Sequence, residues 1–306
     1  MYRKLLFITA FEDFYMDVLS CLLNFKKLGT EEIVVAHVIP SAVFPRMHEG
    51  YVLNITESLK DLLNVKMSRA TRMIEDGGIR ARSRIEFGVP HREILKMAEE
   101  EAVDLIVGGR ERKGFLGEIF VGSLTDKIVR HGGFPVYIPK YPGVYGADPE
   151  TCSSFCSRLF SRVLYPTDWS GCAKDALGYL KGMREAGIEE ILVAHVMDEK
   201  AMKLQPSEKF EEFRRIDLEK LAAVKEEMEK EGFRVRTVLA VGNPRAEVTN
   251  IARMEDVSLI VMGSHGKGRM EGVLWGSVSR NVSEYSDRPV ILIKGGACTG
   301  ESGTDP

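Results

Sequence analysis

Two loops in the second half of the chain carry residues that could bind a sugar and an anion. The first loop, Tyr165-Pro166-Thr167-Asp168-Trp169-Ser170, follows a short apolar run. Its aspartate, Asp168, could accept hydrogen bonds from ribose hydroxyls. The alternative is that Asp168 caps a helix that begins near Ser170, which is a common role of aspartate.

The second loop is rich in glycine and basic residues. It reads Met262-Gly263-Ser264-His265-Gly266-Lys267-Gly268-Arg269, and Gly276-Ser277-Val278-Ser279 follows it. Glycines let backbone N–H groups approach an anion, and the dipole of the helix expected from Ser277 favours negative charge at its start. Lys267 and Arg269 add positive charge. The loop therefore predicts a polyphosphate site, and the alternative interpretation is a flexible glycine-rich turn.

Other nucleotide and metal motifs are missing from the sequence. No G-x-x-x-x-G-K-[ST] pattern occurs, so the chain is not a Walker-type NTPase. The dinucleotide pattern G-x-G-x-x-G begins at Gly266 but fails at Glu271. Cys152 and Cys156 have no second cysteine pair and no histidine nearby, so we expect no zinc site. We see no activated nucleophile and no paired carboxylates at the loop, and we assign no catalytic and no metal-ligating residue.

The elements that must position these loops alternate between strand and helix. Apolar runs at 163–165, 191–194, 259–262 and 290–293, with an alternating run at 235–241, predict strands. Amphipathic segments at 173–184 and 208–231, a segment opened by Pro244 and another from about 276 predict helices. Continuous apolar strands separated by helices indicate a parallel sheet that is covered on both faces.

The chain contains the same pattern twice. Val35-Ala36-His37-Val38 recurs 158 residues later as Val193-Ala194-His195-Val196. Gly88-Val89-Pro90 is matched 154 residues later by Gly242-Asn243-Pro244, and Gly122-Ser123 recurs at the same offset, so the first copy holds an insertion after its second strand. We expect one domain over 1–140, a linker rich in glycine and proline over 141–158, a second domain over 159–295 and a flexible tail over 296–306.

The spacing Gly263-x2-Gly266-x9-Gly276-Ser277, with Pro166-Thr167-Asp168 upstream, resembles the nucleotide signature of ATP-binding universal stress proteins. The resemblance covers nearly the whole chain, twice over, so the chain looks like a tandem member of that family. It implies an α/β fold of two Rossmann-like domains, similar to adenine nucleotide α-hydrolases. Each would hold a five-stranded parallel sheet of order 3-2-1-4-5 with helices on both faces.

The resemblance also implies a site in the second copy, with ATP or AMP as ligand and Mg²⁺ as a candidate ion at the phosphates. Asp168 would hold the ribose, and the backbone of Val196, expected after the second strand, would pair with the adenine edge. His265 lies in the loop, and the resemblance implies no catalytic role for it. The expected binding residues are Pro166, Thr167, Asp168, Val196, Met262, Gly263, His265, Gly266, Lys267, Arg269, Gly276, Ser277, Val278 and Ser279.

The first copy departs from this pattern at two positions. Ala10 stands where the second copy has Asp168, and Arg112 stands where it has Gly266. An arginine side chain would intrude where backbone must approach a phosphate, although Arg112 and Lys113 could attract another anion. The sequence therefore predicts one competent site, in the second copy.

Composition narrows the class of protein. The 306 residues carry a formal net charge of −3, which argues against a protein that binds nucleic acid by neutralising phosphates. No apolar run approaches the ~20 residues of a membrane span. The odd number of cysteines and their scattered spacing fit a reducing cytoplasm, with a Cys152–Cys156 disulfide as the alternative.

The last strand of each copy, at 135–139 and 289–293, should lie at a sheet edge, where exposed backbone invites pairing. We expect the two copies to form an intramolecular pseudo-dimer through these strands, and a homodimer is a further candidate.

Two other functions stay open beside an adenine-nucleotide-binding sensor or regulator of the stress response. One is an interaction module that binds no nucleotide, which the first copy alone would favour. The other is an ATP-using adenylating enzyme of the related fold, but Asp168-Trp169-Ser170-Gly171-Cys172 replaces the pyrophosphate loop of such enzymes. The family pattern implies binding, with at most slow ATP hydrolysis assisted by a divalent cation.

Overall fold

The computed structural model describes residues 2–11, 15–41, 49–113, 118–140, 149–203, 206–266 and 275–294. The chain divides into two compact units. Unit 1 comprises Met1–Gly132 and Val144–Cys156, and unit 2 comprises Gly133–Gly143 and Ser157–Pro306. Among the described helices, none is long and apolar enough to cross a bilayer.

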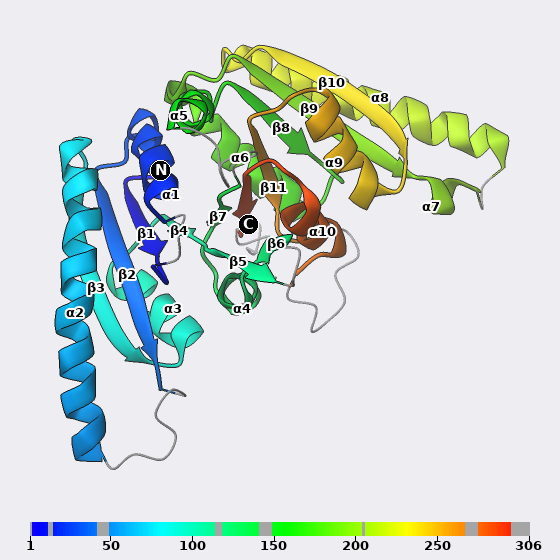
Figure 1. Cartoon of the computed structure of the whole chain (residues 1–306). Coiled ribbons are helices and arrows are strands. Elements are labelled where there is room, and N and C mark those ends of the chain that lie inside the picture. The colour runs from blue at the N-terminus through cyan, green and yellow to red at the C-terminus, as the bar shows by residue number, and fades with distance from the viewer. Residues whose placement is uncertain are drawn as a thin grey trace, which may run out of the picture. The chain divides into compact units, whose positions relative to one another are not determined.

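Unit 1 is built on a parallel sheet of order β3-β2-β1-β4 (Figure 1). Its strands are β1 Lys4–Ile8, β2 Glu32–Pro40, β3 Arg80–Gly88 and β4 Leu105–Val107, with a separate antiparallel hairpin of β5 Arg110–Lys113 and β6 Glu118–Val121. Its helices are α1 Tyr15–Leu22, the 3-10 helix η1 Leu23–Leu28, α2 Glu49–Asp76, α3 Pro90–Glu100, α4 Ser123–His131 and α5 Pro149–Ser157. The sequence did not predict the hairpin, which occupies the place of the glycine loop.

Unit 2 contains the order predicted for a complete domain, β10-β9-β8-β11-β12, with all four pairings parallel. Its strands are β7 Val136–Ile138, β8 Arg162–Pro166, β9 Glu190–Asp198, β10 Val235–Gly242, β11 Leu259–Gly263 and β12 Val290–Ile293. Its helices are α6 Gly171–Lys181, the 3-10 helix η3 Arg184–Ala186, α7 Glu199–Lys203, α8 Ser207–Lys230, α9 Pro244–Met254 and α10 Ser277–Tyr285. The predicted α/β architecture is confirmed.

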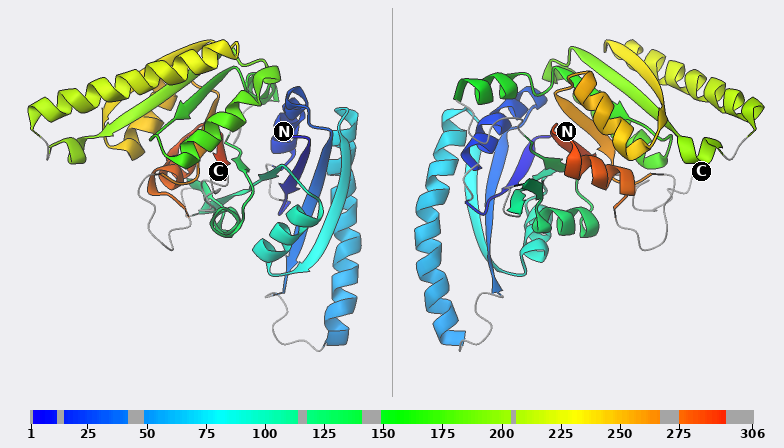
Figure 2. Two further views of the ribbon diagram at one scale, coloured as in Figure 1. Left: turned by 180° about the vertical axis from the view of Figure 1, so that it is seen from behind. Right: turned by 45° about the vertical axis from the view of Figure 1, so that its right-hand side comes forward.

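Helices cover both faces of the sheet in unit 2, which explains its continuous apolar strands. Figures 1 and 2 show α9 and α10 on one face, and α6 and α8 on the other. Every residue of β11 and β12 is buried. The covered sheet leaves the carboxyl ends of its strands as the place where a ligand can bind.

The last strand of the first copy belongs to unit 2. β7 pairs antiparallel with β12, so that Ile138 lies opposite Val290 and Val136 lies opposite Leu292. Lys140, just after β7, is almost fully buried, and its ammonium group donates to the carbonyl of Ser286. The two apolar strands β7 and β12 therefore pair with each other.

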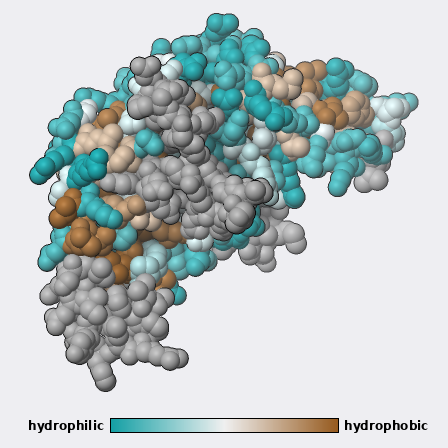
Figure 3. All heavy atoms as spheres, viewed as in Figure 1, coloured by the Kyte–Doolittle hydropathy of each residue, from teal (hydrophilic) through white to brown (hydrophobic). Residues whose placement is uncertain are grey.

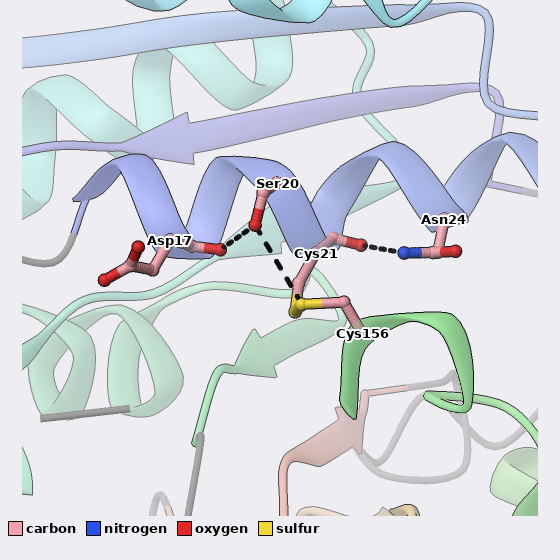
Figure 4. The surroundings of a disulfide bond; sticks show 5 residues. All are labelled: Asp17, Ser20, Cys21, Asn24 and Cys156. Carbon is pink, nitrogen blue, oxygen red and sulfur yellow. Dashed lines mark hydrogen bonds between the residues drawn. A yellow bond between two sulfur atoms is a disulfide. The ribbon is translucent and has the colours of Figure 1, made fainter. Parts of the chain in front are cut away.

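A disulfide that the sequence did not predict joins Cys21 of α1 to Cys156 of α5, across a sequence separation of 135 residues (Figure 4). The alternative of a Cys152–Cys156 disulfide is therefore wrong. Spacing along the chain cannot reveal such a pair, because only the fold brings the two Cα atoms to 4.7 Å. Both residues are buried.

Candidate functional site

A cavity of about 890 Å³ lies in unit 2, at the carboxyl ends of β8, β9 and β11. Its size falls within the range of about 300–1,000 Å³ that is usual for small-molecule sites. Of the residues expected from the sequence, it is lined by Pro166, Thr167, Asp168, Val196, Met262, Gly263, His265, Gly266, Gly276, Ser277, Val278 and Ser279. Lys267 and Arg269 lie outside the described residues. Val196 lies within β9, not after it, because that strand continues to Asp198.

The loop after β8 presents Asp168 to this cavity. Ser170 caps α6, since its hydroxyl accepts from the backbone N–H of Ala173 at 3.2 Å. The interpretation of Asp168 as the helix cap is therefore wrong. Its Oδ1 instead accepts from the N–H of Ser170 at 3.1 Å, which holds the carboxylate in a tight turn. Trp169, between them, takes a positive φ of 65°.

The glycine loop approaches its neighbours more closely than a side chain would allow. A Cβ atom at Gly263 would lie 2.8 Å from the backbone carbonyl carbon of Cys172. One at Gly266 would overlap the Oδ2 atom of Asp168, so the aspartate and the glycine loop lie against each other. One at Gly276 would lie 3.0 Å from the carbonyl oxygen of Ser264. These contacts explain the glycine spacing that the sequence displays.

The start of α10 gives the site its anion-binding geometry. The first hydrogen bond of the helix is donated by the N–H of Arg280 to the carbonyl of Gly276. The N–H groups of Ser277, Val278 and Ser279 therefore have no partner within the helix, as at every helix start. The cavity is lined by these same three residues, and the helix dipole adds positive potential there.

The hydroxyl of Ser279 is occupied within the loop. It is 3% exposed and donates to the carbonyl of Ser264 at 2.6 Å, which also accepts from the N–H of Gly276 at 2.9 Å. A phosphate would therefore meet Ser279 through its backbone, and the hydroxyl fixes the loop against α10. The neighbouring His265 contacts the hydroxyl of Ser264 through Nδ1 at 2.9 Å.

A polar cluster that the sequence did not predict contributes His195, Asp217 and Lys220 to the lining of the cavity. The Nδ1 atom of His195 lies 2.7 Å from the carbonyl of Thr167, and its Nε2 lies 3.3 Å from Oδ2 of Asp217 in α8. The indole of Trp169 donates to Oδ1 of the same aspartate at 2.9 Å. The imidazole and indole rings pack with centroids 4.9 Å apart, and the ammonium of Lys220 lies 5.6 Å from the indole centroid. A comparison of the two copies could have found this cluster, because Asp217 has no acidic counterpart in the first.

One part of the remaining lining is apolar and was also missed, namely Ala201, Met202, Phe213, Ile216, Pro244 and Val248. The same lining includes the polar side chains of His195, Asp198, Asp217 and Lys220. Below it, Tyr165 donates its hydroxyl to the carbonyl of Ala173 at 2.7 Å, and burial raises the pKa of the phenol to about 12. The phenol therefore stays protonated and serves as a structural donor. An apolar wall opposite a few polar groups suits a flat organic ring that also carries charge.

The first copy repeats the backbone and histidine contacts of this site but lacks counterparts of Asp168 and Asp217. Thr9, Phe11 and His37 repeat the contacts of the second copy: Phe11 has a φ of 58°, its N–H donates to Thr9 Oγ1, and His37 Nδ1 lies 2.7 Å from the carbonyl of Thr9. Burial lowers the pKa of His37, and the charge of Lys66 lowers it further, against the backbone hydrogen bond to Thr9. Ala10 stands in place of the aspartate. The side chain of Arg112 lies outside the described part of the chain.

The cavity brings together three kinds of group, which are the carboxylate of Asp168, the backbone at the start of α10 and a set of apolar side chains. Among the described residues, no group of three His, Cys, Asp or Glu side chains could hold a metal ion.

Comparison with known proteins identifies the family. The model of the universal stress protein family matches residues 1–140 and 159–294. The chain is 34% identical to universal stress protein MJ0577 of Methanocaldococcus jannaschii over 157 residues, which cover 45% of this chain and 97% of that protein. It is 22% identical to a universal stress protein of Mycolicibacterium smegmatis over 271 residues, with 86% and 87% of the two chains covered.

A solved structure aligns with nearly the whole chain. The crystal structure of a universal stress protein from Archaeoglobus fulgidus superposes with a TM-score of 0.71 at 26% identity, covering 96% of this chain and 99% of the other. The family pattern is thus present once in each half of the sequence. The chain belongs to the universal stress protein family, as a tandem member.

Proposed function

We propose that this protein binds an adenine nucleotide, ATP or AMP, in the cavity of unit 2 and acts as a nucleotide-dependent regulator in the stress response. The observation that carries the proposal is the meeting of Asp168, Gly263, Gly266 and the first turn of α10 around one cavity. These residues are distant in sequence, and each meets a different part of a nucleotide.

The parts of the site match the parts of a nucleotide in chemistry. The carboxylate of Asp168 accepts from ribose hydroxyls, while the amides of residues 277–279 donate to phosphate oxygens. The apolar wall with Met262 packs against the base beside the backbone of Val196. Mg²⁺ would bind through phosphate oxygens and water, as it commonly does. We assign no catalytic residue.

The first copy supports a stoichiometry of one. It lacks the carboxylate at Ala10, and its glycine loop is replaced by the β5–β6 hairpin. We propose that unit 1 has a structural or regulatory role. We further propose that the protein acts in the cytoplasm. The two repeats would associate through β7 and β12. Bound nucleotide would alter either this association of the repeats or the association of two chains into a homodimer. Such an effect requires a different affinity for the two states.

Calorimetric titration with ATP and AMP, with and without Mg²⁺, tests the proposal. We expect one site per chain, and we expect Asp168→Ala to reduce the affinity about tenfold or more, because hydrogen bonds to a charged group are lost. Asp61→Asn, which removes an exposed carboxylate from α2, should leave binding unchanged.

Two results would contradict the proposal. They are a stoichiometry of two per chain, and binding that survives the loss of Asp168. A wild-type protein that shows no heat and no thermal shift in millimolar ATP would favour the interaction module instead.

A further inference from the structure

The first half of α8 forms a wall of the cavity but is barely packed against the body of unit 2. From Ser207 to Lys220 no side chain is buried, whereas Leu221 and Met228 in the second half are buried. Phe213 and Leu218 are 37% and 46% exposed. Figure 3 shows hydrophobic residues among hydrophilic ones in the region where α8 and β10 lie. Apolar burial alone therefore does not fix this half of the helix.

Asp217 supplies the missing attachment. Among the described residues, the side-chain hydrogen bonds and ion pairs that join 207–220 to other elements of unit 2 are those of the Asp217 carboxylate, and Lys220 adds a cation–π contact with Trp169. One oxygen accepts from the indole of Trp169, and the other faces the imidazole of His195 at 3.3 Å. Asp217 is only 14% exposed at its side chain. Shielded hydrogen bonds to a charge are stronger than exposed ones.

The partners of Asp217 come from two elements that also form the site. His195 lies in β9, and its other nitrogen faces the carbonyl of Thr167, one residue before Asp168. Trp169 lies one residue after Asp168. The two ring nitrogens of His195 thus face two oxygen atoms, one on Thr167 and one on Asp217. The carboxylate thus joins the helix wall to the loop that carries the proposed ribose contact.

The first copy shows what the site would be without this attachment. α2 corresponds to α8: Met67 and Ile74 are buried as Leu221 and Met228 are, each 154 residues apart. Lys66 lies over the ring of Phe11 as Lys220 lies over Trp169. In this register Leu63 takes the place of Asp217. The first copy forms the same loop conformation with leucine there, so the fold does not need the acid.

We propose that Asp217 is a positioning residue that latches the first half of α8 over the cavity, so that Phe213 and Ile216 are held against the ligand. The two acids of the site, Asp168 and Asp217, are replaced together in the first copy, by Ala10 and Leu63. Their joint replacement is expected if both acids contribute to ligand binding. The identity of the ligand, an adenine nucleotide, rests on the proposed function, whereas the latch does not.

Three variants separate the latch from the fold. Asp217→Leu introduces the residue that the first copy has at this position and removes the contacts of the carboxylate with Trp169 and His195. Asp217→Asn keeps a polar group of the same size, whose amide oxygen can accept from Trp169, but it removes the charge. Glu219→Gln is the matched control, since Glu219 pairs only along the exposed helix surface with Arg215 among the contacts described.

Hydrogen exchange of the free protein, followed by mass spectrometry, tests the latch without nucleotide. We expect Asp217→Leu to accelerate exchange of amides 211–220 about tenfold or more, because the first half of α8 then opens. Amides 222–230 should exchange unchanged, because buried side chains hold the second half of the helix. Glu219→Gln should exchange as the wild type does, and Asp217→Asn should lie between the wild type and Asp217→Leu, because it keeps a hydrogen bond but loses the charge. Unchanged exchange in Asp217→Leu would overturn the latch, and so would equal acceleration in both halves of the helix.

Stopped-flow release of ATP, monitored by tryptophan fluorescence, then tests its effect on the ligand. We expect release from Asp217→Leu to be about tenfold faster than from the wild type, with Asp217→Asn between the two. Wild-type release rates in Asp217→Leu would overturn the role of the latch in holding the ligand. If the wild type binds no nucleotide, the proposed function fails, and the exchange experiment still decides whether the latch exists.

Discussion

Gly109, Gly263 and Gly266 have different surroundings, and together they separate the structural role of glycine from its role in binding. A Cβ atom at Gly263 would meet the backbone of Cys172, which can give way only if the helix α6 shifts. At Gly266 it would meet only the carboxylate of Asp168. At Gly109, the position in the first copy that corresponds to Gly263, a Cβ atom would have no neighbour within 4 Å.

We therefore expect Gly263→Ala to lower the melting temperature, at a cost of about 1–3 kcal/mol, because the helix after β8 must shift. Gly266→Ala should keep the melting temperature but weaken ATP binding, since it displaces the carboxylate. Gly109→Ala, the control, should change neither. Thermal unfolding and calorimetric titration measure the two effects. A destabilised Gly266→Ala with normal affinity would contradict this assignment.

The residues of the site could be predicted unevenly. Asp168 and the glycine spacing could be predicted from the sequence, because they lie in short loops whose residue types are typical of a binding site. Asp217 was not, because it sits in a charged helical pattern where an acidic residue is ordinary. Its role depends on contacts to residues 22 and 48 positions away, which only the fold creates.

At the scale of elements, one buried carboxylate ties three of them together in unit 1. Glu101, just after α3, accepts from Lys4 of β1 at 2.8 Å and from Arg82 of β3. Burial by itself would raise the pKa of Glu101, but the hydrogen bonds and charges of Lys4 and Arg82 outweigh burial and lower it to about 2. The ionised form is therefore favoured in the folded state.

This shift makes the stability of the protein depend on pH. A carboxylate whose folded pKa lies below its unfolded value stabilises the fold above the unfolded value, near 4.5, and loses that effect as the pH falls toward 2. We expect Glu101→Gln to cost on the order of 1–3 kcal/mol at pH 7 and much less near pH 2. Urea unfolding at both pH values measures the difference, with the more exposed Glu100→Gln as control. Equal losses at the two pH values would refute the assignment.

The elements themselves were more predictable than their partners. The strands of unit 2 follow the apolar runs because both faces of the sheet are buried, and α9 begins at Pro244 as expected. The last strands of the two copies were expected to associate, but the antiparallel register of β7 against β12 and the β5–β6 hairpin were not predicted. Edge pairing depends on which edges meet, and an apolar run carries no record of its neighbour.

At the scale of the whole chain, the disulfide between Cys21 and Cys156 is the longest-range covalent constraint among the described residues. It joins α1 to α5, which lies in the segment predicted as a linker. A crosslink acts mainly by restricting the unfolded chain, and its effect grows with the length of the loop that it closes. A loop of this length places the expected stabilisation at about 2–5 kcal/mol.

We expect Cys21→Ser and Cys156→Ser each to lower the melting temperature of protein purified under oxidising conditions. The double variant should lose no more than the larger single loss, because either change alone already breaks the bond. Peptide mapping without reductant should recover the joined peptides from the wild type and from the control, Cys152→Ser. If the two single losses add up, they report lost packing of two thiols, and the bond does not stabilise the chain. If mapping recovers both cysteines as thiols, the restraint on the unfolded chain is absent, and α5 is held to α1 by packing alone.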